Sequence, residues 1–164
     1  MDDIVVRSMA KWPDIPHVYG WLSLDRRGNW RLKGELIGNR ALREFIGRNY
    51  QPDARGCWYF QNGPQRVFVA LAYAPLVVHF EGAQLFDHCG RPFQPEQSFL
   101  DDEGSVLMSS KPGVGLLDDR DLAGFADRAQ GLPGVARDEV PKRFGFVPHP
   151  TPGSASTLRH YPTP

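Results

Sequence analysis

Residues 56–71 read GCWYFQNGPQRVFVAL, and this stretch carries the clearest local signal of the fold. Two runs with aromatic and β-branched residues flank Asn62-Gly63, a pair that accepts the positive φ angles of a two-residue hairpin turn. Pro64 has no backbone N–H group, so we expect it just outside the paired strands. The stretch therefore predicts a β-hairpin with Asn62-Gly63 at its turn.

The chain on both sides of this hairpin consists of short apolar runs separated by turn residues. The turn pattern Asp-x-x-Gly is found at residues 25–28, 53–56, 87–90 and 101–104. Short runs joined by tight turns are typical of antiparallel sheets. We expect about eight short strands in one antiparallel meander, with Ile4-Val5-Val6 as a further short strand before an extended arm around Trp12.

Two segments change from the strand period to the helix period. In residues 39–49, apolar side chains recur at i, i+3 and i+4 behind Asn39, which can cap a helix, and Asn49 is expected to end it in a left-handed conformation. Residues 118–130 begin with acidic side chains and stop before Gly131, as a second amphipathic helix would. The predicted fold is α+β, a β-rich antiparallel meander with two packed amphipathic helices.

The domain prediction is a single α+β domain over residues 1–147, followed by a flexible tail at 148–164 that contains five prolines. Two segments, 19–49 and 98–130, each read as a hairpin, a short apolar link and a helix. This likeness indicates an internal duplication of a hairpin–helix unit. The alternative is that turn chemistry and helix periodicity impose the same pattern on any such segment.

Composition limits the classes of function. The 164 residues carry 19 basic and 19 acidic side chains, so the chain has no net attraction for a polyanion, and we do not expect a nucleic-acid partner. The N-terminus is acidic where a signal peptide is basic, and no apolar run is long enough to cross a membrane. Two cysteines are too few for a disulfide scaffold, which favours a cytoplasmic protein with reduced thiols.

Four segments support a family resemblance. They are FQNGPQRV at 60–67, YGWL at 19–22, DRRGNW at 25–30 and NY at 49–50. Together they resemble a family of short hypothetical proteins from β-proteobacteria that is defined only as a domain of unknown function, over about residues 4–147 of this chain. The resemblance implies a bacterial, cytoplasmic, single-domain protein, and it transfers no activity, cofactor or catalytic residue.

Residues 87–89, Asp-His-Cys, bring an acid, a base and a thiol together in the sequence. A Cys–His pair can activate a thiolate, but neighbours along a strand point to opposite faces, and the alternative is a solvated turn. His79, His88 and Cys89 could bind zinc, yet they lack the paired spacing of zinc ligands. We expect no metal, no cofactor and no disulfide between Cys57 and Cys89.

Charged clusters have ordinary explanations beside functional ones. The acids at 101–103 and 118–121 could serve glycoside hydrolysis or bind Mg²⁺, but a hairpin turn and a helix start are where acids normally occur. A basic and aromatic group could bind single-stranded nucleic acid, although alternation predicts that its rings face the core. Its members are Trp21, Arg26, Arg27, Trp30, Arg31 and Lys33.

The candidate site is the tip of the first hairpin, with Gln61, Asn62, Gln65 and Arg66. These groups could bind a carboxylate, a phosphate or a partner backbone, and the alternative is that they brace the hairpin locally. We expect a non-catalytic binding or assembly module. Such a module could form a homodimer through a sheet edge or face. The alternative is a small enzyme with its site near Arg66, at the junction of the two hairpin–helix units.

Overall fold

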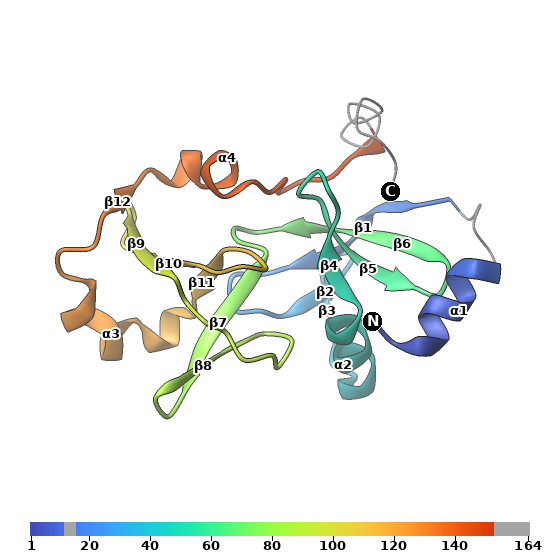
Figure 1. Cartoon of the computed structure of the whole chain (residues 1–164), viewed down its shortest axis with the longest axis horizontal. Coiled ribbons are helices and arrows are strands. Elements are labelled where there is room, and N and C mark those ends of the chain that lie inside the picture. The colour runs from blue at the N-terminus through green and yellow to red at the C-terminus, as the bar shows by residue number, and fades with distance from the viewer. Residues whose placement is uncertain (12–15, 153–164) are drawn as a thin grey trace. The chain divides into compact units, whose positions relative to one another are not determined.

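A computed structural model describes residues 1–11 and 16–152 of the chain. The chain forms two compact units. The first comprises Met1–Leu24, Trp30–Leu71 and the segment that begins at Phe146, and the second comprises Asp25–Asn29 and Ala72–Gly145. Each unit has its own six-stranded sheet (Figure 1). The α+β prediction is confirmed, whereas the boundary of a single domain at residue 147 stays a prediction.

The sheet of the first unit has the strand order β3-β2-β1-β6-β5-β4. Its strands are β1 (Val18–Leu24), β2 (Trp30–Leu32), β3 (Glu35–Leu36), β4 (Tyr50–Pro52), β5 (Trp58–Asn62) and β6 (Gln65–Leu71). Strands β5 and β6 form the hairpin predicted from residues 56–71, with Asn62 paired to Gln65. The turn is therefore Gly63-Pro64 and not Asn62-Gly63, because Gly63 alone takes the positive φ, at 57°.

The predicted single antiparallel meander of about eight strands is wrong, because the described residues form twelve strands in two sheets and both sheets are mixed. In the first sheet β1 runs parallel to β6, with Leu22 opposite Val69 and Leu24 opposite Leu71. Parallel pairing requires a long crossover, and here the chain from β2 to β5 supplies it. The strand period in the sequence does not encode the direction of the partner strand, so the pattern could not reveal this pairing.

Two helices belong to the first unit, α1 (Asp3–Lys11) and α2 (Arg40–Arg48). The strand predicted at Ile4-Val5-Val6 is wrong, since these residues lie in α1 and only Val5 is buried. The start of this helix is tied to the end of α2, where the Asp2 carboxylate pairs with Arg48, whose guanidinium lowers the pKa of Asp2. The arm predicted around residue 12 lies outside the described residues.

Helix α2 agrees with its prediction at the start and differs at the end. The Asn39 side chain accepts a hydrogen bond from the Leu42 N–H group, as an N-cap does. Asn49 is not left-handed, since its φ is −116°, and its side-chain amide instead donates to the Phe45 carbonyl. On the inner side of α2 the Phe45 ring contacts the Phe60 ring edge-on at 5.5 Å, so the helix packs on β5.

The sheet of the second unit has the strand order β12-β9-β10-β11-β7-β8. Its strands are β7 (Leu76–Glu81), β8 (Gln84–Asp87), β9 (Gln97–Asp101), β10 (Val106–Ser109), β11 (Gly115–Leu117) and β12 (Gly134–Val135). The helical segments of this unit are the 3₁₀ turns η1 (Asp119–Asp121) and η2 (Arg137–Glu139) and the helices α3 (Leu122–Ala129) and α4 (Val140–Phe144).

The predicted helix at 118–130 is thus a 3₁₀ turn followed by α3. Helix α4 was not expected, because a short segment with a proline after its first residue has too little periodicity to stand out. The sequence predicted two helices, and the described residues form four α-helices. No helix among these residues has the length and apolar character needed to span a membrane.

The two sheets share one connectivity. The orders β2-β1-β6-β5-β4 and β8-β7-β11-β10-β9 both hold a central parallel pair flanked by antiparallel neighbours. In this correspondence β4–β5 matches β9–β10, whereas the predicted units 19–49 and 98–130 would match β1–β2 with β9–β10. The duplication of a hairpin–helix unit stays a prediction.

The Asp-x-x-Gly segments at residues 25–28, 53–56, 87–90 and 101–104 form the same turn. In each, one oxygen of the Asp side chain accepts hydrogen bonds of 2.8–3.1 Å from the backbone N–H groups two and four residues later. The fourth residue, glycine, has φ between +82° and +85°. The backbone carbonyl of the same Asp accepts from the glycine N–H group, so each carboxylate adds acceptors to a turn that the backbone also closes. This role commits four acidic side chains to structure.

The predicted tail begins on the first unit. The Val147 N–H group donates to the Gly56 carbonyl at 2.8 Å, and the Pro148 carbonyl accepts from the Leu71 N–H group at 2.7 Å. Val147 also packs against the buried residues Cys57, Tyr59 and Phe68. The predicted flexible tail from residue 153 onward lies outside the described residues.

Candidate functional site

The predicted site residues at the β5–β6 tip do not converge. Gln61 pairs with Arg66 and Asn62 with Gln65, so the two pairs lie on opposite faces of the hairpin. The Gln61 side chain is buried and donates to the Gly63 carbonyl at 3.0 Å. Gln65 donates to the Pro16 carbonyl at 3.1 Å, and the Arg66 guanidinium stacks on the Tyr59 ring at 4.4 Å. These contacts brace the hairpin, and its role in recognition stays a prediction.

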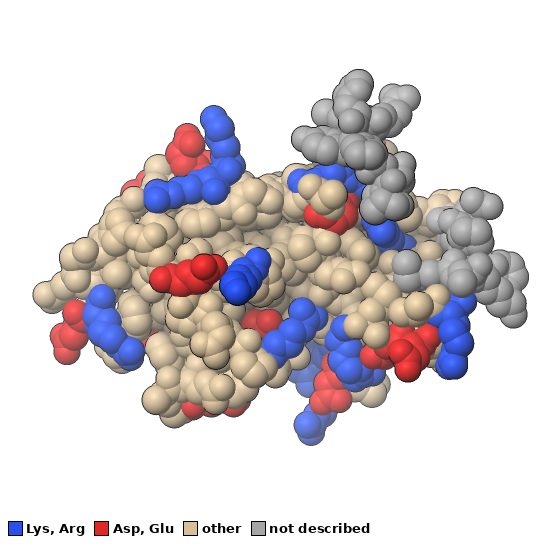
Figure 2. Space-filling model, in the orientation of Figure 1, with Lys and Arg blue, Asp and Glu red and all other residues tan. Residues whose placement is uncertain are grey.

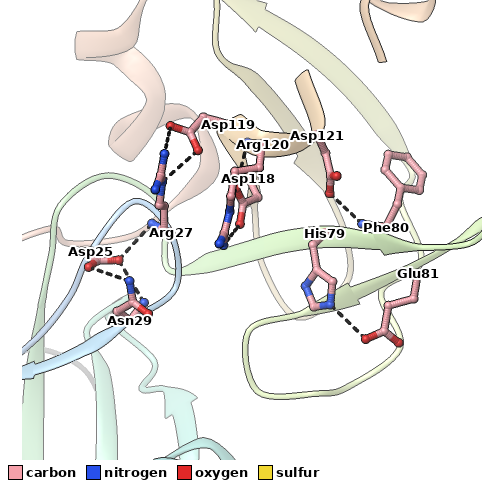
Figure 3. A network of polar contacts seen from close by, with 10 residues as sticks. All are labelled: Asp25, Arg27, Asn29, His79, Phe80, Glu81, Asp118, Asp119, Arg120 and Asp121. Carbon is pink, nitrogen blue, oxygen red and sulfur yellow. Dashed lines mark hydrogen bonds and ion pairs between the residues drawn. The ribbon is translucent and has the colours of Figure 1, made fainter. Parts of the chain in front are cut away.

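A more convergent group of polar side chains lies in the second unit (Figure 3). It surrounds a cleft of about 370 Å³ that we call the polar cleft. Four segments of the chain build it: the turn after residue 24, strand β7, the turn after strand β8 and the 3₁₀ turn η1 with its cap. The lining residues are Arg27, Gly28, Val77, His79, Phe80, His88, Asp118, Arg120 and Asp121.

One wall of the polar cleft is an arginine held by a buried carboxylate. Asp118 caps η1 by accepting a hydrogen bond from the Arg120 N–H group, and its own N–H group donates to the Val78 carbonyl at 2.8 Å. The Arg120 side chain returns to the same carboxylate through Nε at 2.9 Å and Nη2 at 2.5 Å. These hydrogen bonds hold the pKa of Asp118 below its usual value and raise that of Arg120. The pair is therefore ionised and fixed in orientation.

The other arginine of the cleft is oriented in the same way. Arg27 reaches Asp119 with Nε at 3.0 Å and Nη2 at 3.3 Å. Its backbone N–H group is in turn bound by the Asp25 carboxylate in the turn. Figure 3 shows the two arginine–aspartate pairs next to each other along η1. The Arg27 and Arg120 side chains are 53% and 63% exposed, so both stay accessible to a ligand.

The remaining polar groups of the cleft are already bound to the protein. Asp121 accepts a hydrogen bond from the Phe80 N–H group at 2.9 Å, which ties η1 to β7. The His79 Nε2 atom lies 3.3 Å from Glu81 Oε1, at the outer end of the same strand. The acidic side chains at 118–121 therefore cap η1, orient the two arginines and connect η1 to β7. The arginine N–H groups are the donors that the cleft presents to a ligand.

His88 forms part of the cleft floor as a neutral ring. Its Nδ1 atom accepts a hydrogen bond from the Val77 N–H group at 3.1 Å, and burial lowers the pKa of His88 to about 3. The proton of the neutral ring is then on Nε2. Gly28 packs directly on this residue, since a Cβ atom at Gly28 would lie 2.7 Å from the His88 Cβ atom. A glycine is needed here for space as well as for its φ of +82°.

The Asp87-His88-Cys89 run has structural roles, and the His88 Nδ1 atom is occupied by the Val77 N–H group. Asp87 is 4% exposed and serves as a turn carboxylate, so the expectation of a solvated turn is wrong for this residue. Burial raises the pKa of Cys89 to about 12 and that of Cys57 to about 11, and both thiols are free. The described residues contain no group of three or more side chains that could hold a metal ion.

The members of the basic and aromatic group at residues 21–33 are divided between the two units. Trp30 is buried in the first unit, as alternation predicts, where it meets Tyr50 edge-on at 4.8 Å. Trp21 is 51% exposed, contrary to expectation, and its ring lies under the Lys33 ammonium group at 4.1 Å. Arg26 and Arg27 belong to the second unit, where Arg26 donates to the Ser105 hydroxyl at 2.8 Å.

Arg27 and Arg120 were not identified as a site from the sequence, because they are far apart along the chain. The one local signal was Arg120 itself, a cation inside the acidic run 118–121. On the face shown in Figure 2, basic and acidic side chains are interspersed.

Comparisons with known proteins identify the fold and the family. No curated protein matches the chain. A crystal structure of a DUF1285 family protein from Silicibacter pomeroyi DSS-3 matches with a TM-score of 0.53 and 15% identity, over 77% of this chain and 84% of that one. A DUF1285 family protein from Shewanella baltica OS155 matches with a TM-score of 0.51 and 18% identity, over 65% and 90%. At such identities the likeness extends to the fold alone. The family model DUF2944, described as "Protein of unknown function (DUF2946)", matches residues 1–151, and the chain therefore belongs to this family.

Proposed function

We propose that the protein is a non-catalytic binding protein whose polar cleft holds a carboxylate or phosphate group of a small ligand. The observation that carries the proposal is the pair of anchored guanidinium groups at Arg27 and Arg120. A guanidinium has five N–H donors. Arg27 and Arg120 each give two of these donors to an aspartate, which leaves three on each side chain for a ligand. Planar forks of this kind match the oxygens of carboxylates and phosphates.

The neutralising aspartates determine how such a cleft would select its ligand. Each arginine is paired, so the cleft has little long-range attraction for anions, and hydrogen-bond geometry decides what binds. Two charge-assisted hydrogen bonds favour binding, and the entropy lost when the ion is immobilised opposes it. From this balance we expect a dissociation constant for phosphate on the order of 1 mM. A natural ligand would add contacts to Phe80 and Val77, the apolar side chains of the cleft.

The state of the titratable groups supports a binding role over an enzyme. The thiols are protonated at neutral pH, His88 is neutral with Nδ1 occupied, and the turn carboxylates accept backbone hydrogen bonds. A nucleophile or general base needs a pKa near the working pH and an accessible atom. The alternative of a small enzyme near Arg66 gains no support from that side chain, which stacks on Tyr59.

Assembly into a homodimer is a second candidate, and exposed apolar side chains on one face of the first sheet favour it. Trp21 is 51% and Leu36 56% exposed. They lie on the same face, because Ser23 pairs with Arg31 and Arg31 pairs with Leu36. The end strands of this sheet have only two and three residues, which disfavours pairing through an edge. Sedimentation equilibrium of the protein and of its Trp21→Ser variant tests this candidate, which requires a dimer that the substitution weakens.

The cell compartment and the bacterial source of the protein are part of the same proposal. Two free thiols fit a reducing compartment, which supports the cytoplasm. The resemblance of the FQNGPQRV run supports a bacterial protein and a β-proteobacterial group within the family.

Phosphate binding tests the polar cleft. Backbone amide shifts in a phosphate titration at constant ionic strength give a dissociation constant for the protein and for Arg27→Gln, Arg120→Gln and Arg27→Lys. We expect each Gln variant to bind about tenfold more weakly, and Arg27→Lys to recover little of the loss because it restores charge without the fork. The matched control is Arg40→Gln, since Arg40 is an exposed arginine paired with Glu44 on α2. An equal loss in Arg40→Gln, or the absence of saturable binding, would contradict the proposal.

A further inference from the structure

A second cleft of the second unit differs in chemistry from the polar cleft. Its volume is about 470 Å³, within the range of small-molecule sites. It lies beside the β7–β8 hairpin and α3, and we call it the apolar cleft. Six of its lining side chains are large and apolar: Phe80, Leu85, Phe93, Met108, Phe125 and Leu132.

One ionisable side chain lines the apolar cleft, and it is a cation. The Arg128 guanidinium lies 4.9 Å from the centre of the Phe125 ring and 5.2 Å from that of Phe80. Both rings belong to the cleft lining, so they hold the charge at its wall. Within the part of the chain that the structure describes, Arg128 has no carboxylate partner.

We infer that the apolar cleft binds a hydrophobic carboxylic acid, with its chain against the aromatic and aliphatic side chains and its carboxylate on Arg128. An apolar body fits the six large side chains, and an anionic head complements the one charge. A neutral apolar ligand would leave Arg128 without a counter-ion. A highly charged ligand would find no second cation among the lining residues. A saturated acid of eight to twelve carbons suits a cleft of this volume.

The inference goes beyond the proposed function because a different cation carries it. Phe80 lines both clefts, and its N–H group is bound by Asp121. Arg27 and Arg120 do not line the apolar cleft. Loss of phosphate binding in Arg27→Gln together with unchanged binding of a fatty acid would separate the two sites.

The test is calorimetric titration of octanoate, decanoate and dodecanoate, below their micellar concentrations, into the full chain. We expect one saturable site and an affinity that rises about fourfold per methylene added. Decanol, which lacks the carboxylate, is expected to bind at least tenfold more weakly than decanoate.

Two variants connect binding to the cleft. Arg128→Gln should weaken decanoate binding about tenfold and leave decanol unaffected. The control is Arg143→Gln, because Arg143 is also exposed and stacks on aromatic rings, those of Phe99 at 4.6 Å and Phe144 at 5.8 Å. Ala83→Trp places a large ring at an exposed position of the cleft wall and should block both ligands without removing a core side chain.

The inference is overturned if decanoate fails to bind, if decanol binds as tightly as decanoate, or if Arg128→Gln and Arg143→Gln bind decanoate equally. Unchanged binding in Ala83→Trp would place the ligand elsewhere and also overturn it. Circular dichroism of each variant confirms that the fold is retained before the affinities are compared.

Discussion

Replacing Gly28 with alanine tests the packing that forms the floor of the polar cleft. A Cβ atom at this position would lie 2.7 Å from the Cβ atom of His88 and 3.4 Å from that of Val77. Carbon atoms prefer separations of about 3.5–4.0 Å, so at least one neighbour has to move. The φ of +82° adds the strain of a left-handed L-residue.

The structure provides a matched control, Gly104→Ala, in the same unit and the same kind of turn. Gly104 has φ +85°, and a Cβ atom there would have nothing within 4 Å. Backbone strain alone costs about 1–2 kcal/mol at either site. The close contact at Gly28 adds about 1–3 kcal/mol of overpacking. We therefore expect losses of unfolding free energy of about 1–2 kcal/mol for Gly104→Ala and about 2–5 kcal/mol for Gly28→Ala.

Urea unfolding followed by circular dichroism measures both losses as shifts of the midpoint multiplied by the slope. Both glycines belong to the second unit, so the transition of that unit reports both changes. Equal destabilisation by the two substitutions would refute the close approach of Gly28 to His88. A small loss in both would refute the strained turn as well.

Two further predictions concern groups that the proposed function treats as structural. Asp101 accepts hydrogen bonds from two backbone N–H groups and from the Tyr73 hydroxyl at 2.7 Å, so Asp101→Ala should cost about 3–5 kcal/mol of unfolding free energy in urea, against less than about 0.5 kcal/mol for the exposed Asp127→Ala. Similar losses in the two variants would contradict the turn geometry. Thiol pKa values of about 11 and 12 at Cys57 and Cys89 leave about 0.1% thiolate or less at pH 8, so iodoacetamide should alkylate the native protein over 100-fold more slowly than free cysteine. Fast alkylation before unfolding would revive a nucleophilic role.

Local chemistry was predictable from the sequence where neighbours in the chain decide the outcome. Asp and Gly three residues apart form the same turn four times, because the carboxylate and the positive φ act within five residues. The cap at Asn39 followed from the same kind of reasoning. The hairpin at residues 56–71 was predicted with its turn one residue off, since Asn62 and Gly63 both tolerate positive φ and only the register selects Gly63.

Features that depend on distant segments were not predictable in this way. The parallel pairing of β1 with β6 cannot be inferred from the alternation of apolar and polar residues in either strand. Ile4-Val5-Val6 fits a strand or a helix locally, and contacts of Asp2 with Asn49 and Arg48 accompany the helix. For the polar cleft, Arg27 meets Asp119 across 92 residues, so the sequence showed its two halves only as separate charged clusters.

The most direct test of the central claim observes the two anchored guanidinium groups themselves. In a ¹H–¹⁵N spectrum optimised for arginine Nε–H signals, a phosphate titration follows Arg27, Arg120 and the control Arg40 in one sample. The account predicts that the Arg27 and Arg120 signals move together with one dissociation constant while the Arg40 signal stays in place. Movement of all three signals in parallel, or of none, would contradict an anion site in the polar cleft.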